Sequence, residues 1–244
     1  FWIGRYAERA EHTARLLTVT RERYHEFRRR QAMDGSECVP VLLAALGALT
    51  GTETGTGDHH EMVATAPTTL WSLTADRHRP GSLAQSVERL GLSARAVRDQ
   101  MSNDTWMLLS TLERTLLQAG DSPPESHSEG EAFLTSTNTV ALAGLLALSG
   151  VIAESMVHDV GWTMLDIGKR IERAQGLTAL LRVEIASRPH LLTDSGFAWI
   201  LIAEDGSRLV IPLGAAGALP DQDDPRHPHR LPVPQARQVR GRHM

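Results

Sequence analysis

The sequence predicts an all-α fold, a multi-helix bundle, over residues 1–189. Apolar and small residues recur there at every third or fourth position, which is the spacing of one buried face of an α-helix. The alternation of apolar and polar residues that is typical of a half-buried strand is almost absent before residue 190. Stretches rich in Gly and Pro interrupt the helical pattern, so they mark the ends of the helices.

Two helices are predicted in the first fifty residues. The first covers residues 1–30, where a core stripe is formed by Ile3, Ala7, Ala10, Ala14 and Leu17. The second covers residues 37–50. The stretch 51–67 is rich in Gly and Thr and is predicted to be a loop.

Two more helices are predicted on either side of Pro80-Gly81. A short helix over 68–78 carries Leu70 and Trp71 and is stopped by that dipeptide. Ser82 can cap a helix over 83–101, because its hydroxyl can accept a hydrogen bond from a backbone N–H of the first turn. The core stripe of this helix is Leu83, Val87, Leu90, Ala94, Val97 and Met101.

The last three helices are predicted over 104–119, 132–157 and 162–187, with a polar loop at 121–130 and a stop before Pro189. No charged residue lies between Glu131 and Glu154, which raises the question of a membrane span. The apolar part, Val140 to Ala153, is only 14 residues long, which is too short for a hydrocarbon core of about 30 Å. A buried helix without membrane contact is therefore predicted.

The chain changes character at residue 190, so we predict a helical domain over 1–189 and an atypical segment over 190–244. Within the latter, 197–203 and 208–213 flank a polar turn and predict a short β-hairpin. Residues 218–244 contain hardly any core-forming side chains, and either disorder or a reading-frame error would account for them. At the other end, Phe1 starts directly on a helical pattern, so we interpret the chain as an N-terminally truncated fragment.

Composition and motifs exclude several classes of function. The net charge of −4 creates no overall field that attracts nucleic acid. The single cysteine, Cys38, cannot form an internal disulfide, which indicates either a reducing compartment, with a cytoplasmic location expected, or a thiol without a role. Neither a phosphate-binding loop, a dinucleotide fingerprint nor a Gly-x-Ser-x-Gly nucleophile elbow occurs.

Metal binding is also not predicted, nor is any cofactor. A carboxylate-bridged di-metal bundle needs two Glu-x-x-His motifs, and only one, from Glu22 to His25, is present. His59-His60-Glu61 is near Cys38 in sequence, but the spacing matches no known zinc site. Five arginines between Arg21 and Arg30 form either a solvated helix face or a patch for RNA or an acidic partner.

The most informative feature is an internal similarity. Residues 3–10 align with residues 167–174, and the shared segment includes a glycine and a Glu-Arg pair. Five Glu-Arg dipeptides occur, against about 1.6 expected by chance from the content of Glu and Arg. Glu88-Arg89 takes a similar place relative to its own apolar stripe. These observations predict pseudo-repeated helices that carry Glu-Arg pairs.

Neighbouring side chains on a helix diverge by about 100°, so Glu8 and Arg9 cannot pair with each other. On a helical wheel, Arg9 falls inside the apolar arc, where an unpaired charge would be very costly. We therefore expect Arg9 to pair with Glu172, or Arg173 with Glu8, across packed first and last helices. Gly4 and Gly168 would allow the close approach.

The alternative is a binding site or an active site that uses these charges on a peptide-like or anionic ligand. The candidate residues for ion pairing or binding are Glu8, Arg9, Glu88, Arg89, Arg95, Arg98, Glu172 and Arg173. An enzyme predicts that Glu8, Arg9, Glu172 and Arg173 open onto a cavity that solvent can reach. A partner domain predicts that they are sealed between helices while an apolar or arginine-rich patch faces outward.

Three blocks of sequence resemble the alpha-E domain, a bacterial helical family named for its Glu-Arg motif. They are the segment Trp2 to Leu17, the segment Ala94 to Asp99 with Trp106, and the segment Ala153 to Ala174. Lys169 stands where the family pattern has arginine, and the chain beyond about residue 190 departs from the family's usual ending.

The resemblance implies a helical bundle without an established activity of its own. It further implies an ATP-grasp-like partner, either as a separate protein or as a fused upstream domain, and a transglutaminase-like protein as a second partner. The resulting expectation is a non-catalytic partner or substrate-docking domain of an ATP-grasp-type peptide or amide ligase system, with no nucleic acid and no membrane as partners. Besides the enzyme, a stand-alone structural module is a third alternative.

Overall fold

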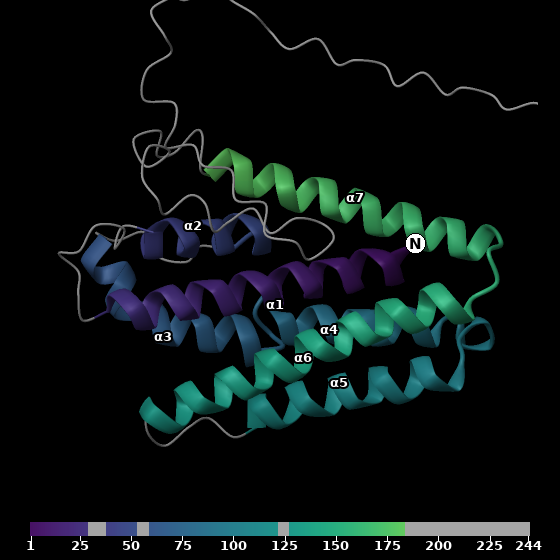
Figure 1. The fold of residues 1–244 in the computed structure, drawn as a ribbon, viewed down its shortest axis with the longest axis horizontal. Coiled ribbons are helices and arrows are strands. Elements are labelled where there is room, and N and C mark those ends of the chain that lie inside the picture. The colour runs from purple at the N-terminus through teal and green to yellow at the C-terminus, as the bar shows by residue number, and fades with distance from the viewer. Residues whose placement is uncertain (29–37, 53–58, 122–126, 184–244) are drawn as a thin grey trace, which may run out of the picture.

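A computed structural model describes residues 1–28, 38–52, 59–121 and 127–183, and within these ranges the chain forms helices and turns without any strand (Figure 1). The predicted all-α class is confirmed for this part of the chain. The predicted hairpin and the segment 218–244 lie outside the described residues. The helices are α1 (Trp2–Phe27), α2 (Cys38–Thr50), α3 (His59–Ala75), α4 (Leu83–Arg95), α5 (Asn103–Asp121), α6 (His127–Ser155) and α7 (Val160–Arg182), with a 3₁₀ turn at Arg98–Gln100.

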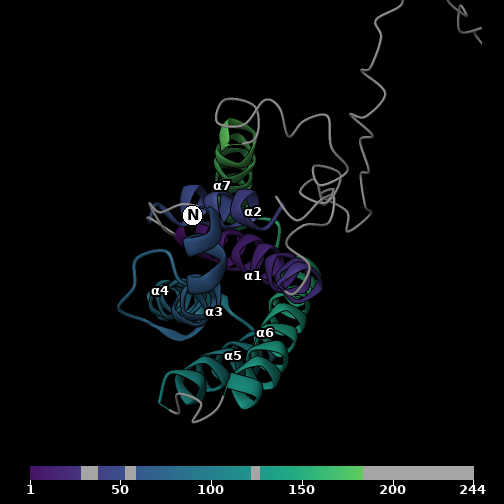
Figure 2. The same cartoon turned by 90° about the vertical axis from the view of Figure 1, so that its left-hand side faces the viewer.

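Helix α1 is the central element of the bundle and contacts α2, α3, α4, α6 and α7. Viewed along the bundle, α7 and α2 lie above α1, α3 and α4 lie to one side, and α5 and α6 lie below (Figure 2). Because α1 is covered from several directions, Ala10, Ala14 and Leu17 are fully buried. Even Thr20 is buried, and its hydroxyl is satisfied by donating to the carbonyl of Leu16 at 2.7 Å.

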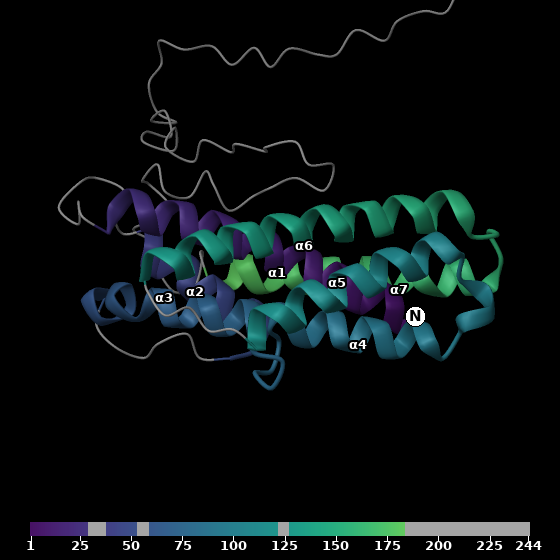
Figure 3. The same ribbon diagram turned by 90° about the horizontal axis from the view of Figure 1, so that it is seen from below.

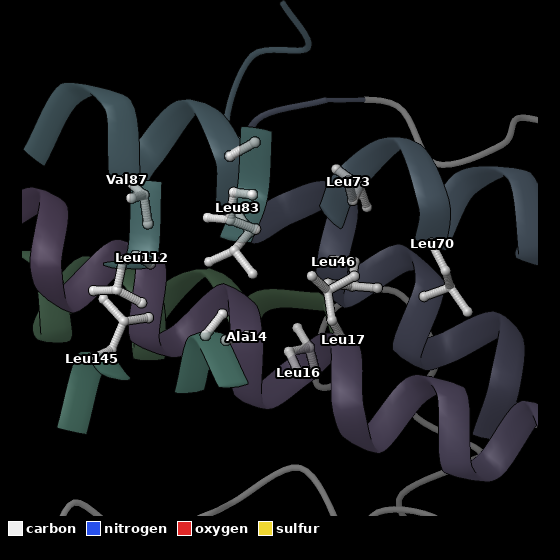
Figure 4. Packing of buried hydrophobic residues seen from close by; sticks show 14 of the residues in the cluster. Ala14, Leu16, Leu17, Leu46, Leu70, Leu73, Leu83, Val87, Leu112 and Leu145 are labelled. Carbon is white, nitrogen blue, oxygen red and sulfur yellow. The ribbon is translucent and has the colours of Figure 1, made fainter. Parts of the chain in front are cut away.

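The hydrophobic core extends along α1 and is filled mainly by leucine side chains from the surrounding helices (Figure 4). Burial of such side chains is the main force that holds helices of moderate propensity together. The labelled members of the cluster are Ala14, Leu16, Leu17, Leu46, Leu70, Leu73, Leu83, Val87, Leu112 and Leu145.

Helix α3 contradicts the predicted loop at 51–67, because it begins at His59 and contains Pro67. Proline lacks the N–H that an interior helical position donates, so local sequence argues against a helix here. Met62 and Ala66 are nevertheless buried in the core. Tertiary packing thus outweighs the local signal.

The end predicted at residue 101 for the following helix is also wrong, since α4 ends at Arg95. Val97 leaves the helical conformation, with φ −129° and ψ 39°, before the 3₁₀ turn. Val97 and Met101 still pack against the core, which explains why the apolar spacing continued through the break. At the other end, Ser82 accepts a hydrogen bond from the Gln85 N–H at 3.0 Å, as predicted for the cap.

Helix α6 runs beside α5 and begins at His127, within the stretch predicted as the loop 121–130 (Figure 3). By length and composition, Gly130–Ser155 would suffice to cross a membrane, with a mean hydropathy of 1.6 over its most apolar window. The argument from a short apolar stretch therefore does not exclude a span. In the bundle, Leu134, Ala141, Leu145, Leu148 and Ile152 of this helix are buried against its neighbours. The absence of membrane contact stays a prediction.

Candidate functional site

Helices α1 and α7 lie side by side and run in the same direction (Figure 1). Two glycines permit their backbones to touch. A Cβ on Gly4 would lie 2.0 Å from the carbonyl oxygen of Leu165, and a Cβ on Gly168 would lie 2.2 Å from the carbonyl oxygen of Phe1. Both distances are far below van der Waals contact, so only glycine fits this parallel crossing.

Two reciprocal ion pairs follow directly after the glycine contacts. The Arg173 Nε donates to Glu8 Oε1 at 2.6 Å, and its Nη2 donates to Glu8 Oε2 at 3.1 Å. In the opposite direction, Arg9 Nε donates to Glu172 Oε1 at 2.5 Å. The two pairings that the sequence offered as alternatives are thus present together. We call these residues, Glu8, Arg9, Glu172 and Arg173, the Glu-Arg cluster.

Three further side chains, which the sequence analysis did not identify, contact the Glu-Arg cluster. Arg5 Nε donates to Glu172 Oε2 at 2.6 Å and Arg5 Nη2 donates to Gln175 Oε1 at 2.5 Å. His12 Nε2 lies 2.9 Å from Glu8 Oε1. Arg5 precedes Arg9 by four residues and His12 follows Glu8 by four, so helical spacing alone was the signal that pointed to them.

Aromatic rings cover the outer side of these arginines. The Arg5 guanidinium lies 5.5 Å from the centre of the Trp2 ring, and that of Arg9 lies 5.6 Å from the centre of the Tyr6 ring. Such cation–π contacts favour a positive charge and remove it partly from water. Together with the carboxylates, they leave the arginine side chains only 16% to 30% exposed.

The carboxylates are buried more deeply than the arginines, since the side chain of Glu8 is 1% exposed and that of Glu172 is 10% exposed. Burial by itself would raise the pKa of Glu8, but hydrogen bonds from His12 and Arg173 outweigh it and lower that pKa to about 2. Glu8 therefore remains ionised at neutral pH. A carboxylate held in this way is suited to structural pairing, and it is poorly suited to accept a proton.

The depressed pKa of Glu8 predicts a pH dependence of stability. A pKa near 2 in the folded state, against 4.5 in the absence of these contacts, contributes stability that is fully present above about pH 4.5. The contribution, on the order of 3 kcal/mol, is lost as the pH falls toward 2. Urea unfolding at a series of pH values should show this loss, and the Glu8→Gln variant should show a flatter profile between pH 5 and 2. An equally steep profile for Glu8→Gln would assign the loss to other carboxylates.

The other candidate residues do not reach the Glu-Arg cluster. Glu88 and Arg89 are exposed on α4 and form no ion pair within the described ranges. Arg95 instead donates to both oxygens of Glu113, at 2.9 and 2.8 Å, and the Arg98 guanidinium lies 5.4 Å from the Trp106 ring centre. The Glu-Arg pair of α4 thus differs in environment from those of α1 and α7, and a general helical repeat is not confirmed.

The arginine run at the end of α1 is largely engaged with neighbouring groups. Arg28 donates to Glu131 of α6 at 2.5 Å, Arg21 contacts Thr135 of the same helix, and Arg23 pairs with Glu26. For the part of the run that the structure describes, the interpretation as an open basic patch for RNA therefore receives no support.

Among the described residues, no three His, Cys, Asp or Glu side chains are grouped as metal ligands would be. His25 lies 3.7 Å from Glu131, and the side chain of His59 lies outside what the structure describes. Cys38 is buried, and burial raises the pKa of its thiol to about 11. A thiol in this state is protonated at neutral pH and is a poor nucleophile or ligand.

A pocket of about 470 Å³ lies elsewhere in the fold, between the end of α3, α4 and α5. Its walls include Trp71, Val87, Leu92, Leu116 and Leu117, and its charged groups include Arg95 and Glu113. None of the four residues of the Glu-Arg cluster lines it. The charges between α1 and α7 and the pocket are therefore separate features.

Comparison with known proteins gives a family and several relatives. The model of the Alpha-E family, described as a predicted alpha-helical domain with a conserved ER motif, matches residues 1–208. An uncharacterized protein of Mycobacterium bovis and one of Mycobacterium tuberculosis strain CDC 1551 are each 62% identical over 195 residues, and one of strain H37Rv is 61% identical. These matches cover 78% of this chain and 22% of each relative, so the chain spans about a fifth of the length of the curated relatives it matches. No solved structure matches significantly.

Proposed function

Because the chain belongs to the Alpha-E family, we propose that it is a non-catalytic partner domain of an ATP-grasp-type peptide or amide ligase system. The observation that supports this proposal is that the charged groups of the Glu-Arg cluster are paired with one another and not available to a ligand. All four oxygens of Glu8 and Glu172 accept hydrogen bonds from Arg5, Arg9 and Arg173. A ligand would have to displace these internal partners from carboxylates that are nearly inaccessible.

An outward apolar surface on α7 gives the domain a means to dock. We define the α7 outer face as Val160, Met164, Ile167, Ile171 and Ala174, which follow one another at intervals of four or three residues. Val160, Met164, Ile167 and Ile171 are 74%, 47%, 40% and 39% exposed, whereas Leu165, Gly168, Glu172 and Gly176 on the adjoining face of the helix are buried. A row of exposed apolar side chains along one helix is typical of a protein–protein interface.

The relatives are consistent with such a role, because the matched region makes up only 22% of each of them. In those proteins the equivalent region is one part of a much longer chain. The ligase partner itself is our inference from the family resemblance, as is the further association with a transglutaminase-like protein. Since ATP-dependent ligation needs cellular ATP, the proposal places the domain in the cytoplasm.

The alternative of an enzyme built on Glu8, Arg9, Glu172 and Arg173 receives less support. It requires these charges to open onto a cavity, and the pocket described above is lined by other residues of α3, α4 and α5. The depressed pKa of Glu8 also removes the proton that a general acid would donate at neutral pH.

Docking can be tested by co-purification of this chain with an ATP-grasp-type ligase produced from the same organism. We expect a stable complex in mild salt, and at least tenfold weaker binding for Ile167→Glu and Ile171→Glu, because each places a charge at the centre of an apolar contact. Surface plasmon resonance would measure the affinities. Met107→Glu is the matched control, since Met107 is 63% exposed on α5 and lies outside the α7 outer face. Repeated failure to co-purify, or equal losses for Met107→Glu and Ile167→Glu, would contradict the proposal.

A further inference from the structure

The pocket between α3, α4 and α5 is an elongated cavity, and the proposed docking through α7 does not involve it. It extends along α4 from Ala84 to Arg95, a distance of about 16 Å at 1.5 Å per residue. Its volume of about 470 Å³ lies in the range of sites that hold small organic molecules, about 300–1,000 Å³. It is therefore large enough for a ligand of several linked groups.

Small residues create the hollow and larger apolar residues line it. Ala75, Ala84 and Gly120 lie in the wall, and a Cβ on Gly120 would lie 3.1 Å from the carbonyl oxygen of Ala75. Leu92 and Leu117 are 55% and 48% exposed where they border the cavity. A ligand with apolar groups would cover these exposed leucines, which gives it a hydrophobic driving force.

One end of the cavity is fixed by a turn with many internal hydrogen bonds. The Asp76 side chain accepts the His78 N–H at 2.8 Å, and the Asp76 carbonyl accepts the Ser82 hydroxyl at 2.7 Å. At the other end, the Glu113 side chain passes over Gly91 and pairs with Arg95. Only glycine leaves room for it at this position, because a Cβ on Gly91 would lie 1.9 Å from Glu113 Oε1. The walls are thus held in place before any ligand binds, which lowers the entropic cost of binding.

Most charges around the cavity already have partners, and the exceptions indicate the ligand. Arg95 and Glu113 pair with each other, and Asp76 is engaged by its turn. Glu88 forms no ion pair in the described part of the chain, and Arg77 makes only a 3.4 Å contact to the ring of His78 there. One anion and one cation beside an apolar surface complement a molecule that carries one positive and one negative charge on an apolar body.

From this combination we infer that the pocket binds a short peptide with apolar side chains and free termini. Its amino group would pair with Glu88 and its carboxylate with Arg77, while its side chains would cover Leu92 and Leu117. A nucleotide or other polyanion does not fit, since the acids Asp76, Glu88 and Glu113 outnumber the arginines Arg77 and Arg95 at the cavity. A fatty acid does not fit either, because its apolar tail would leave the Glu88 carboxylate beside it without a partner.

The test uses the full chain, three peptide probes (trileucine, N-acetyl-trileucine and trileucine amide) and octanoate as an apolar carboxylate for comparison. Binding is measured by isothermal titration calorimetry. We expect trileucine to bind, and each blocked peptide to bind about fivefold more weakly, because an exposed ion pair is worth up to about 1 kcal/mol. Leu117→Lys should weaken all three probes at least tenfold, since it removes an apolar contact and places a charge there.

Substitutions of Glu88 and Arg77 test which terminus of the peptide each residue binds. Glu88→Gln should weaken trileucine about fivefold without weakening N-acetyl-trileucine further, and Arg77→Gln should act in the same manner on trileucine amide. Glu154→Gln, an exposed carboxylate on α6 away from the pocket, is the matched control and should change nothing. The inference is overturned if trileucine does not bind at millimolar concentration, if blocked termini make no difference, or if octanoate binds more tightly than trileucine. Because docking is tested on the α7 outer face, the two proposals can fail separately.

Discussion

Replacing Arg173 with alanine should lower the free energy of unfolding by about 3–5 kcal/mol, because it removes two charge-assisted hydrogen bonds from the buried carboxylate of Glu8. Glu8 is 1% exposed, and two of its hydrogen bonds come from Arg173. The desolvation of Glu8 is then offset only by His12, whose Nε2 lies 2.9 Å from Glu8 Oε1. Urea-induced unfolding followed by circular dichroism would measure the change.

Arg170→Ala provides the matched control on the same helix. Arg170 also pairs with a carboxylate, Asp166, at 2.7 Å, but its side chain is 76% exposed. Pairs in water contribute about 0–1 kcal/mol, so the Arg170 variant should unfold almost as the parent protein does. A loss below about 1 kcal/mol for Arg173→Ala as well would place Arg173 in the same solvated class and would contradict the buried cluster.

The second large effect is expected for Gly4→Ala, at about 2–3 kcal/mol of lost stability. The added methyl group would lie 2.0 Å from the carbonyl oxygen of Leu165 and 2.9 Å from the backbone nitrogen of Lys169. Both are backbone atoms of α7, so the clash is relieved only if α1 and α7 move apart. Such a movement would also lengthen the ion pairs of the Glu-Arg cluster. The midpoint and slope of urea unfolding would report the loss.

Gly150→Ala is the corresponding control, since a Cβ at Gly150 would meet nothing within 4 Å. Alanine is favoured over glycine inside a helix by about 0.5–1 kcal/mol, so this variant of α6 should be slightly more stable than the parent. Opposite signs for two Gly→Ala substitutions would show that the close approach, and not helix propensity, governs position 4. A stabilising Gly4→Ala would contradict the contact between α1 and α7.

The pairing of α1 with α7 was predictable because the first helix places a charged residue on its apolar side without a partner in the same helix. Arg9 lies in an apolar arc and Glu8 cannot reach it, so a distant carboxylate was required, and the similar segment at 167–174 supplied one. Sequence did not predict that the two helices run in the same direction. It also missed Arg5 and His12, because their spacing of four residues from Arg9 and Glu8 does not by itself separate buried from solvated side chains.

Other features depend on tertiary packing that no local pattern encodes. The start of α3 is dictated by burial of Met62 and Ala66 despite Pro67, and the break after α4 occurs although Val97 and Met101 keep their core contacts. The pocket was also not predicted, since its walls come from three helices and a turn. The exposed row on α7 follows helical spacing, but only the structure shows that the adjoining face of this helix packs against α1.

A double-mutant cycle on Glu8 and Arg173 tests the reciprocal pairing between α1 and α7 most directly. The variants Glu8→Gln and Arg173→Met remove one charge each and keep most of the side-chain volume, and the double variant removes both. The free energies of unfolding should give a coupling energy of about 2 kcal/mol or more at pH 7, because the charges meet in a nearly dry contact. A coupling energy below about 0.5 kcal/mol, as is found for residues that do not touch, would contradict the account.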